Sequence, residues 1–490
     1  MSVYQNIDNN EAFNLLFPDQ TADDSLSSAA VSENRPGAGN NKLDEKLPPQ
    51  TQAQYPARKV KIGFILDAPF PADTPQSNRA EREATALVLA GYEVHLLCLW
   101  ADNGITPERP SREEYYRGIY IHRVLPADVK YALPFFKIQT RLPYQGLLKA
   151  AADFFLNRDT AWYALIDRFI RFYGLDILQV QGLRLLDTAL SAAKKRTTPI
   201  VSDLSRHEPA WMELSREKQS PLLARRARNK WEAIERRGLR KAARVLIASE
   251  EAHERLLAKC VEEDISAKKL AIVPDAPDIE KFAQMPFSGD INRQFKSWFL
   301  ISAAGDFERN DEGLQTILEA LSILKPEIPE LFFVAAGPVD AAYRRELEVL
   351  IDRHGLNHRV HLSGKLSPED IAQYIEASDL CIMPQLANDY RDHTLCENAY
   401  VYHLIKKPII ASDCKAAERY IKQTIGGLIY PSGNAEELAN QIRRLYYDTD
   451  LKKLMGENGL QAVLNQYNWQ ICSASLIHAY ESLVSEHISI

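Results

Sequence analysis

Residues 299–433 constrain the fold most, because short apolar strands alternate there with helical patterns. Residues 299–305 and 331–337 are apolar runs that end in glycine, and the strand pattern at 359–364, in which apolar and polar residues alternate, ends in glycine as well. Continuous apolar strands separated by helices are typical of a parallel sheet covered on both faces. Ligands bind at the carboxyl ends of the strands in such doubly wound sheets. These glycines therefore mark the edge where we expect a ligand site.

The same alternation begins earlier, with a buried strand at 58–66 and a helix from about Arg79 to Ala90. We predict a first α/β domain over residues 58–280, a linker over 281–296, a second α/β domain over 297–468, and a terminal helix over 469–490 that packs back on the first domain. The opening strand-helix-strand unit lacks GxGxxG, so a nicotinamide-dinucleotide fingerprint is absent there.

Residues 1–57 are rich in Asn, Asp, Ser, Gln and Pro. Such a composition cannot bury enough apolar surface to offset the entropy of the chain, so we predict a disordered leader. Apolar residues gather only at 12–17. A helical turn there that docks on a partner is the alternative.

The composition of the 490 residues excludes several classes of protein. A net charge of -7 argues against nucleic acid as the main partner. The six cysteines are scattered without the spacing of metal ligands, so we predict no metal site and a reducing compartment. No apolar run approaches the ~20 residues that span a bilayer. We therefore expect a cytoplasmic protein.

Two basic stretches lie in the first domain. Residues 131–173 mix Lys and Arg with many aromatic residues, a composition typical of an interfacial helix on anionic lipid. Amphipathic helices packed on a sheet have the same composition, so a peripheral contact at the inner face of the membrane is one of two interpretations. Residues 225–244 place basic residues around a helix, which favours a solvated face.

The order of motifs in the second domain resembles that of retaining glycosyltransferases of family 4. The sequence reads VAAGP at 334–338 with Tyr343 after it, RVHLSGKL at 359–366, KPIIAS at 407–412 and GGLIYP at 426–431. The first domain matches more loosely. The resemblance covers about residues 59–480 and implies the GT-B fold, in which two Rossmann-like doubly wound domains face a cleft.

Members of this family bind a nucleoside-diphosphate sugar between the domains and transfer the sugar with retention, without a cofactor or metal. An Arg and a Lys hold the diphosphate, and a Glu-x7-Glu pair reaches the sugar and the ribose. The leaving phosphates need cations or helix amides directed at them.

This chain departs from the family pattern at the expected charged positions. Asp306 stands where Arg is usual and Glu312 where Lys is usual, and two acids would repel a diphosphate. Counting back from Pro408 places Val401 and His393 at the two Glu positions. A helix beginning near His393 would then offer its amides to the phosphates. A shifted pair, Asp389 and Glu397, has the x7 spacing but the wrong distance to the proline, which favours coincidence.

The resemblance places the donor site at strand ends and loops of the second domain. The predicted donor-binding residues are Gly305, Arg309, Gly337, Gly364, Lys365, Arg391, His393, Thr394, Glu397 and Glu418. Arg79 and His207 are predicted on the acceptor side, and no catalytic residue is identified. Gln179 and Gln181 stand where a histidine often follows the fourth strand.

The resemblance predicts a glycosyltransferase that acts in the synthesis of polysaccharides or glycoconjugates. The departures at the donor site leave an alternative, an inactive GT-B scaffold that serves as partner or regulator of another enzyme. A GT-B sugar-nucleotide 2-epimerase is a further alternative, although the chain shows no convincing set of carboxylates and histidine for that chemistry.

Overall fold

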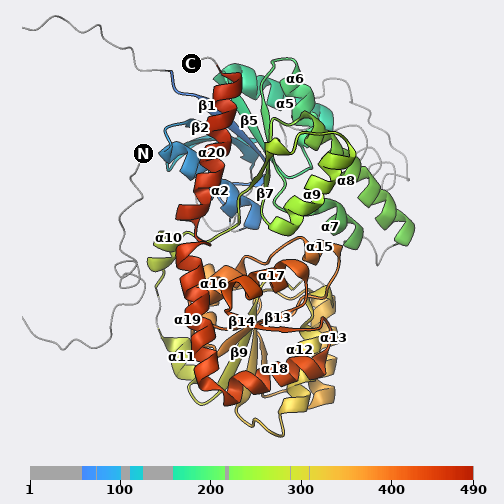
Figure 1. The fold of residues 1–490 in the computed structure, drawn as a ribbon, viewed down its shortest axis with the longest axis vertical. Helices are drawn as coiled ribbons and strands as arrows, with labels where there is room; N and C mark the ends of the chain where they lie inside the picture. The colour runs from blue at the N-terminus through green and yellow to red at the C-terminus, as the bar shows by residue number, and fades with distance from the viewer. Residues whose placement is uncertain are drawn as a thin grey trace, which may run out of the picture. The chain divides into compact units, whose positions relative to one another are not determined.

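Two β-sheets form the framework of the structure, a computed structural model (Figure 1). It describes residues 58–72, 74–100, 111–124, 158–215, 220–286, 289–307 and 310–488, so the predicted leader lies outside the described residues. Within these ranges, no helix has the length and apolar character that crossing a membrane requires.

The first sheet has eight strands in the order β3-β4-β2-β1-β5-β6-β7-β8, and only β3 pairs antiparallel. All five residues of β5 are buried, as expected for a strand covered on both faces. The strands are β1 (Lys61–Pro69), β2 (Glu93–Leu99), β3 (Glu113–Tyr116), β4 (Ile119–Val124), β5 (Ile177–Gln181), β6 (Ile200–Asp203), β7 (Arg244–Ile247) and β8 (Leu270–Ile272).

Helices cover both faces of this sheet. Apolar residues of α2 and of the terminal helix α20 share one core cluster with β1 and β2, and residues of α5, α6 and α9 share another with β5 and β7. The helices are α2 (Pro75–Leu89), α5 (Arg158–Tyr173), α6 (Leu186–Lys194), α7 (Glu208–Leu214), α8 (Pro221–Lys241), α9 (Glu250–Glu262) and the 3-10 helix η1 (Ala267–Lys269).

The first helix begins at Pro75, four residues before the predicted Arg79. The Thr74 hydroxyl accepts a hydrogen bond from the Ser77 amide at 3.2 Å, and proline fits the first helical turn. Gly91, with φ = +94°, follows the end of the helix as the sequence predicts.

The second sheet has six parallel strands in the order β11-β10-β9-β12-β13-β14. These strands are β9 (Phe299–Ala304), β10 (Leu331–Ala336), β11 (Val360–Leu362), β12 (Leu380–Met383), β13 (Ile409–Ser412) and β14 (Gly427–Tyr430). Its helices are η2 (Asn310–Glu312), α12 (Leu314–Leu324), α13 (Ala341–His354), α14 (Pro368–Ala377), α15 (Asp389–Asp392), α16 (Asn398–Leu404), α17 (Lys415–Thr424), α18 (Ala435–Tyr447) and α19 (Thr449–Asn465).

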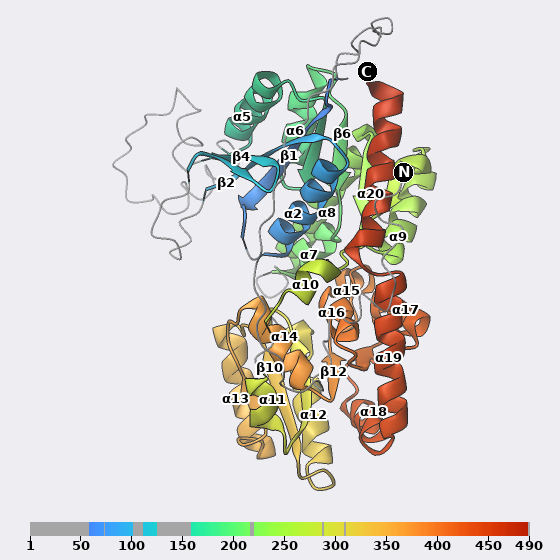
Figure 2. The ribbon, with the colours of Figure 1, turned by 90° about the vertical axis from the view of Figure 1, so that its left-hand side faces the viewer.

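Two segments connect the sheets. The predicted linker, 281–296, contains the short helix α11 (Asp290–Phe295) and the second half of α10 (Ile279–Ala283). The return segment leads into α20 (Trp469–His487), which lies beside α2 in Figures 1 and 2 and joins the core of the first sheet. The two segments are bonded to each other, because the Trp469 amide donates to the Pro277 carbonyl at 2.8 Å. The predicted return of the final helix to the first domain is confirmed.

Candidate active site

Three glycines meet at the carboxyl ends of β9, β10 and β11. Gly337 pairs with Gly364 through a backbone bridge, and a Cβ atom on Gly337 would lie 2.0 Å from the carbonyl oxygen of Gly305. Gly337 also has φ = +143°, a conformation that other residues rarely adopt. The structure thus brings these three predicted residues together, and at Gly337 the neighbouring backbone leaves no room for a side chain.

Replacing Gly337 by alanine is expected to reduce the free energy of unfolding by about 2–3 kcal/mol, because backbone strain and the clash with Gly305 add. Equilibrium urea unfolding measures this loss. Gly433 offers a control, since its φ is +76° but an added Cβ would lie 3.6 Å from its nearest neighbour, Leu386 Cδ2. Equal losses in Gly337→Ala and Gly433→Ala would show that the contact with Gly305 is unimportant.

The loop after β12 lies against the glycine cluster. The Asn398 side-chain amide donates to the Ala304 carbonyl at 2.8 Å, directly before Gly305. The Leu386 amide donates to the Asp311 carbonyl at 2.8 Å, which joins this loop to the segment before α12. The polar residues of the loop are therefore held near the strand ends where a ligand was predicted.

The predicted helix start near His393 is wrong. The Asn388 side chain accepts a hydrogen bond from the Arg391 amide at 3.0 Å and so begins the four-residue helix α15, which ends at His393. The next helix, α16, begins only at Asn398. The Asn388 cap determines where α15 begins. The prediction counts positions back from Pro408 and does not take the cap into account.

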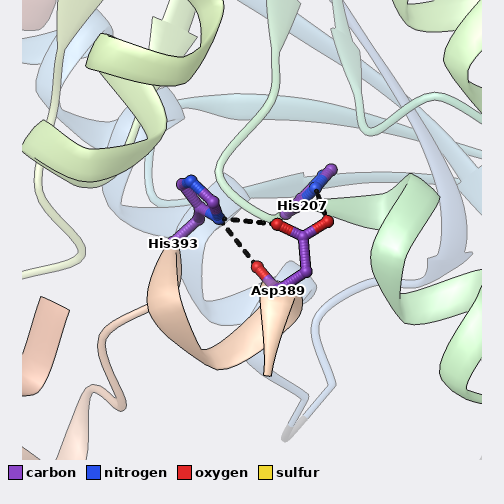
Figure 3. Close-up of side chains that lie close together, drawn as sticks. All are labelled: His207, Asp389 and His393. Atoms are coloured by element: carbon purple, nitrogen blue, oxygen red, sulfur yellow. Dashed lines mark hydrogen bonds and ion pairs between the residues drawn. The ribbon is translucent and has the colours of Figure 1, made fainter. Parts of the chain in front are cut away.

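Asp389 is the centre of a polar cluster (Figure 3). Its Oδ2 atom lies 3.1 Å from Nε2 of His207 and 2.6 Å from Nη2 of Arg228. Its Oδ1 atom lies 3.3 Å from Nδ1 of His393, which also donates to the Asp389 backbone carbonyl at 2.7 Å. Hydrogen bonds from the two imidazoles hold the pKa of Asp389 well below its usual range, so it is a carboxylate.

His207 is a neutral imidazole with one free nitrogen. Its side chain is 1% exposed, and burial lowers its pKa. Because Nε2 donates to Asp389, Nδ1 carries the unshared pair, and it is buried without a hydrogen-bond partner among the described residues. The buried Thr394 hydroxyl oxygen also lacks a partner there. Buried polar atoms normally have partners, so both atoms have unused hydrogen-bonding capacity.

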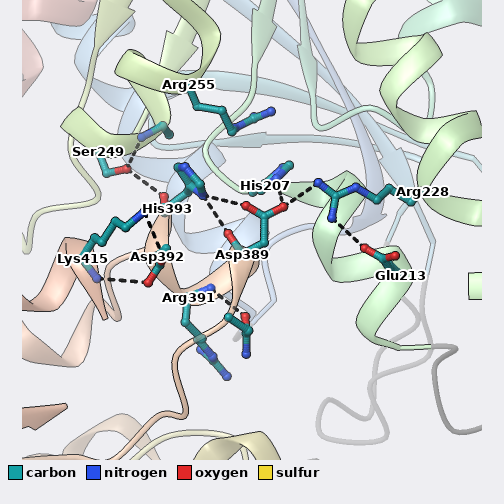
Figure 4. A network of polar contacts seen from close by, with 12 residues as sticks. His207, Glu213, Arg228, Ser249, Arg255, Asp389, Arg391, Asp392, His393 and Lys415 are labelled. Carbon is teal, nitrogen blue, oxygen red and sulfur yellow. Dashed lines mark hydrogen bonds and ion pairs between the residues drawn. The ribbon is translucent and has the colours of Figure 1, made fainter. Parts of the chain in front are cut away.

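Residues of α8 and α9 hold this cluster from the side of the first sheet (Figure 4). Arg228 donates to Glu213 at 2.7 Å and to Glu232 at 2.9 Å as well as to Asp389. The Ser249 hydroxyl donates to the His393 carbonyl at 2.8 Å. Asp389 and His393 are therefore positioned by both parts of the chain.

Arg391 neutralises the unexpected acid at position 312. Its guanidinium forms a hydrogen-bonded ion pair with Glu312, and the two side chains are 12% and 9% exposed. Burial opposes the charge on Arg391, but the attraction of Glu312 outweighs it and raises the pKa of Arg391. Glu312 is thus paired, and the repulsion of a diphosphate that the sequence predicts is reduced.

His207, Asp389 and His393 have ring-nitrogen and carboxylate atoms within 4.8 Å of one another. Imidazole and carboxylate are ligands of divalent metals. However, Arg228 already binds the same carboxylate, and its charge opposes a second cation. We assign no metal to this cluster, and the predicted absence of a metal stays a prediction.

Four further residues were predicted to bind the donor, and the structure describes three of them. Arg309 is not among the described residues. Lys365 is exposed directly after Gly364, and Glu397 is half-buried immediately before α16. Glu418 pairs with Lys422 at 2.6 Å on α17 and lines a surface pocket with it.

Arg79 has a structural role rather than the predicted contact with an acceptor. It is 2% exposed and donates to both carboxylate oxygens of Asp203, at 2.8 and 3.1 Å. It also pairs with Glu83 at 3.0 Å. The Arg79 guanidinium is buried and binds Asp203 and Glu83, so it is not exposed to a ligand.

Sequence reasoning missed the partners of these residues. Gln179 and Gln181 donate to Glu83 at 2.7 and 2.6 Å, so they hold the buried Arg79 network. The x7 spacing of Asp389 and Glu397 was the available signal for Asp389. No pattern pointed to Arg228, which lies 161 residues from Asp389.

The architecture and these strand-end loops match known proteins along most of the chain. Residues 76–274 match the Glycosyl transferase 4-like domain, and residues 292–462 match Glycosyl transferases group 1. Sucrose-phosphate synthase from Thermosynechococcus elongatus has a similar fold, with TM-score 0.65, 17% identity, and coverage of 87% of this chain and 100% of that one. Anabaena Alr3699/HepE in complex with UDP also has a similar fold, with TM-score 0.61 and 15% identity. The match covers 86% of this chain and 100% of that one.

The chain is therefore a GT-B protein. Within that class it belongs to the family 4-type glycosyltransferases, as its motifs indicate. Alpha-D-kanosaminyltransferase of Streptomyces kanamyceticus is 26% identical over 35% of this chain and 43% of its own length. Phosphatidyl-myo-inositol mannosyltransferase of Mycobacterium leprae is 19% identical over 44% of this chain and 54% of its own length. The chain thus spans about half the length of these relatives.

Proposed function

We propose that this protein transfers a sugar, with retention, from a nucleoside-diphosphate sugar to an acceptor in polysaccharide or glycoconjugate synthesis. The observation that supports this most is that the segment 386–398, which contains Asp389, is bonded to loops at the strand ends of both sheets. Asn398 ties the loop that contains Asp389 to the end of β9, and His207 reaches Asp389 from the end of β6. Groups suited to a sugar thus adjoin backbone suited to a nucleotide.

The glycine cluster suits the nucleoside diphosphate. The close backbone approach at Gly305 and Gly337 keeps side chains out of these strand ends, although their own amides already donate to the Ala336 carbonyl and the Ser363 hydroxyl. Gly364 would offer main-chain atoms to the base, and Glu397 would offer its carboxylate to the ribose. These contacts rely little on the basic side chains that the sequence lacks.

The Asp389 cluster suits the transferred sugar. The unpartnered Nδ1 of His207 can accept a hydrogen bond from a sugar hydroxyl, and the Thr394 hydroxyl can donate or accept one. The Asp389 carboxylate, already paired with Arg228, holds the His207 ring in the orientation that presents this Nδ1 atom. Same-face transfer with retention needs no protein base.

Calorimetric titration with UDP-, GDP- and ADP-linked sugars tests the proposal. UDP-glucose is included because Anabaena Alr3699/HepE was solved with UDP-glucose. We expect one donor to bind at micromolar to low millimolar concentration and to release its nucleotide when an acceptor is present. Binding of none of them at millimolar concentration would support the inactive scaffold. Isomerisation of the sugar on the nucleotide would support the epimerase.

Removing Arg391 should weaken donor binding about tenfold, because the buried Glu312 carboxylate would lose this cation and its negative charge would oppose the diphosphate. The double variant Arg391→Ala/Glu312→Gln removes that anion and should recover most of the affinity. Calorimetry with the best donor measures both, and Arg353→Ala, on the exposed end of α13, is the control. Equal losses in the single and double variants would mean that Arg391 contacts the donor directly.

A cytoplasmic location and a peripheral contact with the membrane through residues 131–173 are also proposed. Residues 131–157 lie outside the described residues. In the described remainder, Trp162, Ile166 and Phe169 of α5 are buried in the core of the first sheet. That part of the stretch packs on the sheet, so a lipid contact would fall on its other residues.

A further inference from the structure

Helix α8 presents one continuous basic face to solvent. Its residues at 224, 227, 234, 238 and 239 are buried, whereas the opposite side is exposed along the whole helix. At 1.5 Å per residue, its 21 residues form a stripe of about 30 Å. Seven exposed basic residues define this α8 basic face: Arg225, Arg226, Lys230, Arg236, Arg237, Arg240 and Lys241.

The acidic residues of α8 are already paired with cations. Glu235 is 1% exposed and binds Arg255 and Lys259, at 2.7 Å each. Glu232, whose side chain is 30% exposed, binds Arg228 at 2.9 Å. The helix therefore contributes cations to its exposed side, while one of its carboxylates is buried and the other is bound by Arg228.

Neighbouring acids compensate only part of this charge. Glu263 binds Arg236 and Arg240, and Asp187 binds Arg237. Arg225 and Arg226, near the start of the helix, form no ion pair with another residue that the structure describes. In a chain of net charge -7, so local an excess of positive charge indicates an anionic partner.

Two leucines adjoin the unpaired arginines. Leu222 and Leu223 follow Pro221 in the first turn of α8 and are 60% and 48% exposed. Exposed apolar residues beside a row of cations are the composition of a surface that binds lipid, because the leucines can enter the acyl boundary while the cations meet headgroup phosphates. A purely polyanionic partner would gain nothing from the leucines.

We infer that the α8 basic face docks on an anionic lipid bilayer, with Leu222 and Leu223 inserted and Arg225 and Arg226 at the headgroups. In Figure 1 this helix lies at the margin of the part of the chain that contains the first sheet. This surface is formed by a different stretch of the sequence from residues 131–173. Docking through it does not depend on sugar transfer.

Vesicle sedimentation with the full chain tests the inference. The probes are vesicles of phosphatidylcholine alone and of phosphatidylcholine with a third phosphatidylglycerol, at low salt. We expect at least tenfold tighter binding to the anionic vesicles. Arg225→Glu/Arg226→Glu should lose at least tenfold in affinity for them, and Leu222→Ser/Leu223→Ser should lose about threefold or more. Binding should weaken as salt rises.

The control makes the same charge change elsewhere. Arg345→Glu/Arg353→Glu alters two exposed residues of α13, beside the second sheet, and should bind within twofold of the wild type. Failure of the wild type to sediment, equal loss in the control, or an unaffected Arg225→Glu/Arg226→Glu variant would each overturn the inference. So would binding to a single-stranded RNA oligomer as tightly as to vesicles, with no effect of the leucine variant. Donor binding, measured by calorimetry, should be unchanged in every variant.

Discussion

Replacing Asp389 by alanine is expected to weaken donor binding about a hundredfold, equivalent to ~2.7 kcal/mol. The carboxylate accepts hydrogen bonds from His207, His393 and Arg228. Its loss releases the His207 imidazole, leaves His393 with only the backbone carbonyl of residue 389, and removes one of the three carboxylates that bind Arg228. The free nitrogen of His207 would then no longer be fixed. Orienting partners of this kind typically affect a site by 10–100-fold.

The variant Asp389→Asn tests the negative charge of this side chain, because asparagine has nearly the same shape as aspartate but is neutral. Asparagine keeps one acceptor oxygen, so it can still bind Arg228 or an imidazole but not all three donors. We expect an intermediate loss of about tenfold with the best nucleotide-sugar, measured by calorimetry. Asp392→Ala, in the same short helix, is the control, because Asp392 binds Lys415 rather than the cluster. If Asp389→Ala retains wild-type affinity, the sugar does not lie at this cluster.

The fold was predictable because it depends on local pattern. The apolar runs at 299–304 and 331–336 coincide with β9 and β10, since buried parallel strands need uninterrupted apolar residues. Gly337 was predictable for a related reason. A backbone that must approach Gly305 within contact tolerates only glycine, and a strand ending in glycine shows this in the sequence.

The site was less predictable because its contacts are distant in sequence. Asp389 meets His207 across 182 residues, and no local pattern encodes that pairing. Glu312 seemed to exclude a diphosphate because its neutralising partner, Arg391, lies 79 residues away. Residue type at one position predicts charge, but the partner decides how much of that charge a ligand meets.

Replacing Arg79 by methionine is expected to reduce the free energy of unfolding by about 3–5 kcal/mol, because it leaves buried carboxylates without their cation. Asp203 and Glu83 are both 0% exposed, and Arg79 binds each of them. Equilibrium urea unfolding measures the loss. Arg117→Met is the control, since Arg117 pairs with Glu81 of the same helix but is 56% exposed, and it should cost below about 1 kcal/mol.

The loss should depend on pH in a defined direction. Burial already raises the pKa of Glu83 and of Asp203, opposed by Arg79, and without Arg79 both pKa values rise further. A carboxyl whose folded pKa exceeds its unfolded pKa stabilises the fold as pH falls through the folded value, because the folded state then binds the proton first. Arg79→Met should therefore be less destabilised at pH 5 than at pH 8. Adding Asp203→Asn should restore part of the stability at pH 8, and an equal loss at both pH values would show that packing, not charge, is what Arg79 supplies.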